Sequence, residues 1–106
     1  HLSSFSYSDA MTKDAMCELH KTFNYVADPH GAVAYLGAKD YLKINPDTHC
    51  VFLETAHPTK FLEVVEDVIK IKLDLPEQIK SVIDKKKSSI KISQYSELKS
   101  FLLNNR

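Results

Sequence analysis

The chain has 106 residues, of which 43% are hydrophobic and 26% charged, which is the composition of one ordinary globular domain. Fourteen Lys and Arg balance 14 Asp and Glu, so the net charge gives no electrostatic basis for binding nucleic acid or an anionic membrane. The apolar stretch at 32–38 is much shorter than the ~20 residues that cross a bilayer. Cys17 and Cys50 lack the CxxC spacing, which favours a reducing, cytoplasmic setting.

Two helices are expected in the first half of the chain. Apolar residues recur at helical spacing from Asp9 to Tyr25, and Ser8 or Asp9 can cap that helix. Asp28 is the expected cap of the next helix, with Pro29 at its first position. Since 32–38 is apolar or small on every face, it predicts a helix that is buried on all sides.

A short apolar run follows the turn at 45–47. Residues 50–53 read Cys-Val-Phe-Leu, and Glu54 and Thr55 close the run. Such a run is typical of a strand buried on both faces of a parallel sheet.

Three more helices are expected after this strand. The first begins at Pro58, the second after Leu75-Pro76, and the last behind a Ser93 cap. The inner stripes of the first two are predicted to contain Phe61, Val64, Val65, Val68 and Ile69, and then Ile79, Val82 and Ile83.

The predicted fold class is therefore α/β, with about five helices and one buried strand. The backbone of a strand needs hydrogen-bond partners, and the segments 2–7 and 89–92 are only weak candidates. Without parallel neighbours for 50–55, we expect residues 1–106 to form a single C-terminal segment of a longer α/β enzyme.

Thr55 is the main candidate functional residue, because open α/β sheets bind ligands at the carboxyl ends of their strands. Its hydroxyl suits a neutral heteroatom better than a charge. A threonine that simply ends a strand remains the structural alternative. The five histidines lack zinc-site spacing; His57 can orient the turn at Thr55 or cap the next helix, and His30 suggests no catalytic role.

Two segments together carry a family resemblance. The sequence DPHGAVA at 28–34, followed by TAHPTKF at 55–61, resembles the C-terminal part of bacterial threonine synthase. The order continues through LDLP at 73–76, and SYSD at 6–9 also fits, so the resemblance covers nearly the whole chain. The sequence departs from the family at Thr59, where Ala is usual, and at Glu54, where a small residue is common.

The resemblance implies a fold-type-II pyridoxal 5'-phosphate enzyme that converts O-phospho-L-homoserine and water to L-threonine and phosphate. It implies that the Thr55 hydroxyl hydrogen-bonds the pyridine nitrogen of the cofactor. The lysine that forms the Schiff base and the phosphate-binding loop lie upstream in the family. We therefore expect these 106 residues to contain no catalytic residue, to be inactive alone and to be able to self-associate.

Two alternatives remain open at this point. One is another fold-type-II lyase, such as a serine or threonine dehydratase, although the pairing of the two motifs argues against it. The other is a non-catalytic helical interaction module, against which the all-apolar stretch at 32–38 and the isolated strand argue.

Overall fold

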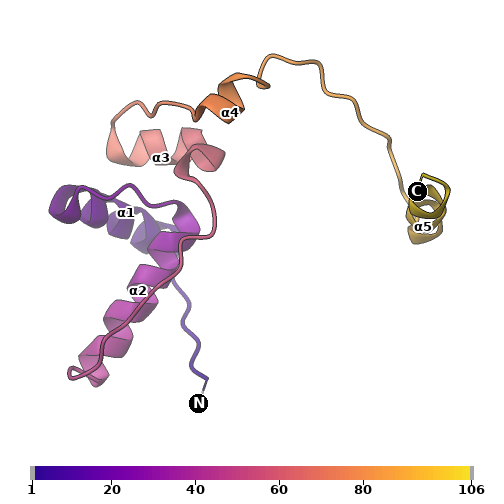
Figure 1. Cartoon of the computed structure of the whole chain (residues 1–106). Coiled ribbons are helices and arrows are strands. Elements are labelled where there is room, and N and C mark those ends of the chain that lie inside the picture. Colours follow the sequence, from indigo (N-terminus) through magenta and orange to yellow (C-terminus); the bar gives the residue numbers. More distant parts are fainter. Residues whose placement is uncertain (1, 106) are drawn as a thin grey trace. The chain divides into compact units, whose positions relative to one another are not determined.

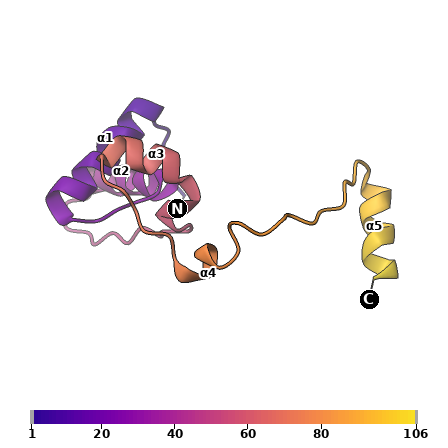
Figure 2. The same cartoon turned by 90° about the horizontal axis from the view of Figure 1, so that it is seen from above.

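The computed structural model describes residues 2–105, which form five α-helices and one short 3-10 helix (Figures 1 and 2). This number of helices confirms the prediction. The chain divides into two compact units, one up to Leu75 and one from Pro76 on. None of the described helices is long and apolar enough to cross a membrane.

Helix α1 (Asp9–Phe23) begins as the sequence predicts. The Ser8 side chain accepts a hydrogen bond from the Met11 N–H at 3.4 Å, so a short oxygen satisfies a first-turn donor. The helix ends two residues before Tyr25, because Asn24 adopts a left-handed conformation with φ 51°. Its N–H bonds back to the His20 and Leu19 carbonyls and closes the last turn.

Helix α2 (Pro29–Ile44) also begins as predicted, with Asp28 as its cap and Pro29 in its first turn. The predicted burial of its apolar stretch on all sides is wrong. Gly31 and Ala32 are buried, whereas Val33 is 37% exposed. One side of α2 packs on α1, while the irregular segments at 2–7 and 46–57 cover the rest of 32–38 only in part.

The core lies where α1, α2 and α3 (Leu62–Ile69) meet. Ala15 and Met16 of α1, Ala32 of α2 and Val65 of α3 are at most 1% exposed and form one cluster. Half-buried apolar side chains surround this cluster: Val26, Tyr35, Leu36, Phe61, Val68, Ile69 and Leu73. Since burial of apolar area is the main stabilising term, these contacts hold α3 on α1.

The predicted inner stripe of the helix after Pro58 is confirmed at Val65 and wrong at Val64, which is 42% exposed. The segment starts as a 3-10 helix, η1 (Pro58–Phe61), and continues as α3. Helix α3 ends at Ile69, and it is capped by Lys70, a left-handed residue whose N–H bonds to the Glu66 carbonyl.

The predicted buried strand at 50–53 is wrong. The described residues contain no strand, and 46–57 is an irregular segment that runs back along α2 (Figure 1). Val51 is 88% and Leu53 74% exposed, whereas Cys50, Phe52 and Glu54 are half-buried. The segment keeps the period-2 alternation of an extended chain, but no described segment pairs with its backbone. The weak strand candidates at 2–7 and 89–92 are irregular as well.

The second unit contains α4 (Glu77–Lys80) and α5 (Tyr95–Asn104). The predicted inward stripe of Ile79, Val82 and Ile83 is wrong. The helix ends at Lys80, so Val82 and Ile83 lie in the turn that follows it, and all three side chains are 42–57% exposed. The cap of α5 is Gln94 instead of Ser93. The Glu97 carboxylate accepts the Ser93 and Gln94 N–H groups in a capping box, which places the cap one residue later.

Candidate functional site

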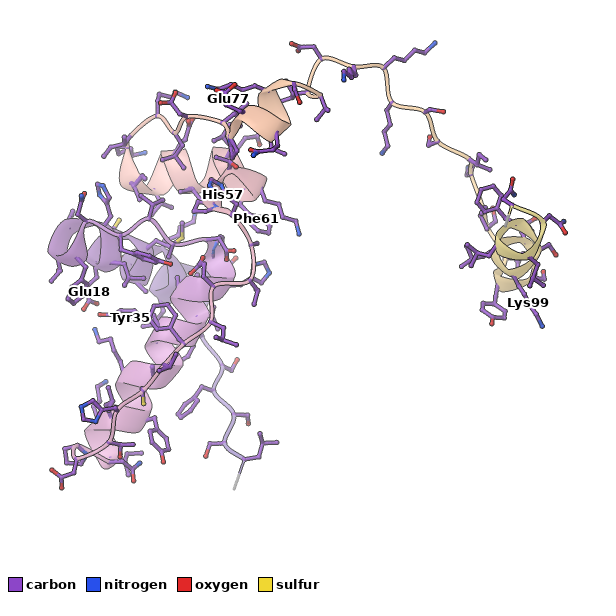
Figure 3. The ribbon with its side chains drawn as sticks, in the orientation of Figure 1. Glu18, Tyr35, His57, Phe61, Glu77 and Lys99 are labelled. Atoms are coloured by element: carbon purple, nitrogen blue, oxygen red, sulfur yellow. The ribbon has the colours of Figure 1, made fainter. Side chains whose placement is uncertain are left out.

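The candidate site lies where the segment after α2 passes the start of α2 and enters η1. Its side chains come from three parts of the first unit: Tyr25 and Asp28 before α2, Glu54 and Thr55 on the extended segment, and His57 at the start of η1. Figure 3 shows His57 and Phe61 beside the start of α3.

Thr55 is exposed and follows Val51 and Leu53 on the open face of the segment. The opposite face is anchored on the helices. The Phe52 ring meets the Tyr35 ring edge-on with centroids 5.9 Å apart, and Glu54 reaches the start of α2. This alternation therefore presents the Thr55 hydroxyl on a surface that the first unit leaves open.

Asp28 holds the other side of the site as a buried cap. Its Oδ1 accepts the N–H groups of His30 at 2.5 Å and Gly31 at 3.1 Å, while Oδ2 has no partner among the described residues. The carboxylate offsets the positive end of the helix dipole. Since the side chain is 0% exposed, Asp28 is a structural cap in this unit.

Glu54 makes contacts in this site that the sequence did not predict. Its Oε1 accepts the Asp28 backbone N–H at 2.8 Å, and its Oε2 lies 3.5 Å from the Tyr25 hydroxyl. Burial raises the pKa of Tyr25, and the nearby Glu54 and Asp28 carboxylates raise it further. The only sequence signal was the departure from the family pattern at Glu54.

His57 caps η1, which was one of its two expected roles. Its Nδ1 accepts the Thr59 N–H at 3.2 Å and lies 2.8 Å from the Thr59 hydroxyl oxygen. Because a backbone N–H can only donate, Nδ1 is an acceptor and a neutral ring carries its proton on Nε2. The ring thus fixes the turn that directly follows Thr55.

The His30 side chain makes structural contacts. Its ring packs against Phe61 with centroids 5.0 Å apart, and its Nδ1 lies 3.2 Å from Asp28 Oδ1. The contact ties the first turn of α2 to η1. Within residues 2–105, no group of three or more His, Cys, Asp or Glu side chains could hold a metal ion.

A surface cavity of about 580 Å³ between α1 and α3 does not belong to this site. Its lining residues are Asp9, Thr12, Lys13, Met16, Pro29, Glu63, Val64 and Asp67. Thr55 is not among them, so the cavity makes no contribution to the candidate site.

Comparison with known proteins assigns a family. A family model described as "Threonine synthase, C-terminal" matches residues 31–102. Threonine synthase of Buchnera aphidicola from Acyrthosiphon pisum is 42% identical over 92% of the chain, and that of Escherichia coli is 45% identical over 67%. The crystal structure of Escherichia coli threonine synthase superposes with a TM-score of 0.76 and 35% identity over 92% of the chain.

These matches define the class of protein: the chain corresponds to the mostly helical C-terminal region of threonine synthases. The chain belongs to the threonine synthase family. It spans 22% of the length of the Buchnera relative and 22% of the Escherichia coli crystal-structure chain. The family resemblance stated from the two sequence motifs is thereby confirmed.

Proposed function

We propose that the full-length protein carrying this chain is a threonine synthase, which converts O-phospho-L-homoserine and water to L-threonine and phosphate. We also propose a fold-type-II architecture, pyridoxal 5'-phosphate as cofactor, and the cytoplasm as its location. The family membership of the chain supports the activity. We propose that residues 1–106 form a C-terminal segment that is inactive alone, because the catalytic lysine and phosphate loop implied by the family have no match in it.

The role proposed for this segment is to supply the partner of the pyridine nitrogen, through the Thr55 hydroxyl. The observation that carries this proposal is the exposure of Thr55 on the open face of 50–55, while Phe52 and Glu54 anchor the other face. A hydroxyl held there can reach a group bound by another part of the enzyme. The residues therefore fit the cofactor at this one contact.

The Thr55 hydroxyl is a neutral hydrogen-bond donor, and this limits how it can act on a cofactor. Pyridoxal phosphate, when bound, supplies an electron sink for reactions at amino-acid carbons. A neutral hydroxyl donates a hydrogen bond to a ring nitrogen but does not stabilise a positive charge there as a carboxylate would. The Thr55 hydroxyl would therefore hold the ring nitrogen of a bound cofactor by a hydrogen bond without charging it.

Val51 and Leu53 support a docking role for the same face. They expose large apolar side chains beside Thr55, and exposed apolar patches usually mark contact surfaces. We infer that this face meets the remaining part of the enzyme, and that in the isolated chain it can mediate self-association.

The test of the activity is an assay of the full-length protein with O-phospho-L-homoserine, in which threonine and phosphate are measured together. Equal amounts of both products are expected, and removal of pyridoxal phosphate by dialysis should abolish them. In a parallel assay with serine or threonine as the substrate, a dehydratase would instead release a 2-oxo acid and ammonia. Formation of that pair of products without phosphate release would contradict the proposed function.

A further inference from the structure

We propose that Glu54 is a positioning residue for Thr55, and that Gly31 leaves the space in which the Glu54 carboxylate lies. This inference rests on the role proposed above for Thr55. It concerns how the chain aims that hydroxyl.

The Glu54 carboxylate is held mainly through one of its oxygens. Oε1 accepts the backbone N–H of Asp28 at 2.8 Å, and Oε2 lies 3.5 Å from the hydroxyl of Tyr25. The side chain is therefore pinned to the residues that precede α2, and it holds the backbone next to Thr55 with it.

Gly31 has no side chain and leaves room for the Glu54 carboxylate. A Cβ built on Gly31 would overlap the Glu54 carboxyl group, with Oε2 as the nearest atom. The φ angle of Gly31 is not positive, so the backbone conformation does not demand glycine. A side chain at position 31 would instead have to displace the Glu54 carboxylate. Residues 31 and 54 are therefore a matched pair, although they lie 23 positions apart in the sequence.

The position of Thr55 follows from this anchor. Phe52 and Glu54 fix one face of the extended segment on the helices, and His57 fixes the turn that follows. Between Phe52 and His57, the carboxylate of Glu54 is the contact that holds the residue next to Thr55. When it is lost, the backbone at 54–56 can rotate and turn the hydroxyl away.

The hydrogen bond from the Asp28 N–H does not require a negative charge on Glu54. The buried Asp28 carboxylate already caps α2 by accepting two N–H groups, so a second carboxylate nearby adds repulsion as well as a hydrogen bond. Glutamine keeps an acceptor oxygen for the Asp28 N–H and removes that repulsion. Glu54→Gln should therefore preserve the position of Thr55, whereas Glu54→Ala should not.

The experiment measures the affinity of the full-length apoenzyme for pyridoxal phosphate, and in parallel the thermal unfolding of each variant. Glu54→Ala should weaken cofactor binding about tenfold, since a displaced hydrogen-bond partner costs about that factor. Glu54→Gln should stay within about threefold of wild type. If Glu54→Ala impairs folding, Glu54→Asp replaces it, because aspartate withdraws the carboxylate by one methylene. The cofactor affinity of Glu54→Asp should lie between those of Glu54→Ala and Glu54→Gln.

Gly31→Ala provides an independent test from the other side of the contact. It should displace the carboxylate and weaken cofactor binding about as much as Glu54→Ala. The double variant should be no worse than Glu54→Ala alone, because the obstructed side chain is gone and contacting residues are not additive. Additive losses in the double variant would overturn the matched pair.

Three outcomes distinguish the positioning role of Glu54 from the cofactor-binding role of Thr55. If Glu54→Ala lowers the unfolding temperature but binds cofactor like wild type, Glu54 is merely structural and the inference is wrong. If Thr55→Val weakens cofactor binding while all Glu54 variants bind normally, the inference fails and the role of Thr55 stands. If Thr55→Val binds normally, the role of Thr55 itself fails.

Discussion

Replacement of Val65 by Asp tests the core of the first unit. Val65 is 0% exposed and packs with Ala15, Met16 and Ala32 at the junction of three helices. The new carboxylate would be buried among apolar side chains. Burial of a polar group without a partner costs about 2–7 kcal/mol, and a charge costs more unless it takes up a proton.

The magnitude can be set against a milder change at the same position. Val65→Ala removes two buried methyl groups at about 0.8 kcal/mol each, and the cavity raises the loss to about 2–3 kcal/mol. A unit of this size is stable by only about 4–11 kcal/mol. We therefore expect Val65→Asp to remove most or all of the stability of the first unit.

The neighbouring Val64 provides the matched control, because it is 42% exposed on the same helix. Val64→Asp should change the stability by less than about 1 kcal/mol, as is usual for surface positions. The assay is thermal unfolding of the chain followed by circular dichroism, where 1 kcal/mol corresponds to about 4–8 °C. Equal unfolding temperatures for Val65→Asp and Val64→Asp would refute the assigned core.

Three further predictions concern acid stability, helix capping and association. Hydrogen bonds from Lys39 and Tyr35 lower the pKa of Glu18 below its ordinary 4.5. The stabilisation by the Glu18 carboxylate is therefore present above pH 4.5 and is lost as the pH falls through the lowered pKa. Glu18→Gln should flatten the acid side of a plot of melting temperature against pH, and an unchanged plot would contradict this. Asp28→Ala should cost about 1–2 kcal/mol in urea unfolding and Asp28→Asn less, and equal losses would argue against the cap. The isolated chain should dimerise or bind an apolar dye through its open 50–55 face, and a clean monomer without dye binding in sedimentation would count against that.

Local signals in the sequence were sufficient for the starts of α1 and α2. Ser8 and Asp28 each satisfy N–H groups two or three residues ahead, and Pro29 fits a first turn whatever the rest of the fold does. The capping of η1 by His57 is local in the same way. Such contacts are encoded within a few residues, so a single sequence predicts them.

Contacts between distant residues explain what the sequence did not predict. The apolar run at 50–53 has the composition of a buried strand, but burial depends on partners that no described segment supplies. The apolar stretch of α2 is mostly half-buried instead of fully buried for the same reason. The pairing of Glu54 with Gly31 joins residues far apart in the chain, and neither residue alone indicates it. Thr55 was selected as the end of a buried strand that the described residues do not contain, and the Glu54 contact beside it could not be predicted from the sequence.

The central claim is that Thr55 supplies the hydroxyl partner of the pyridine nitrogen, and it is tested most directly by comparing Thr55→Val with Thr55→Ser in the full-length enzyme. Valine keeps the shape and removes the hydroxyl; serine keeps the hydroxyl and loses one methyl group. An unpaired buried nitrogen costs about 1–3 kcal/mol, so valine should lower cofactor affinity or turnover about 5- to 150-fold. Serine should stay within about threefold of wild type. Packing alone would make valine the milder change, so equal behaviour of the two variants, or a weaker serine variant, would contradict the claim.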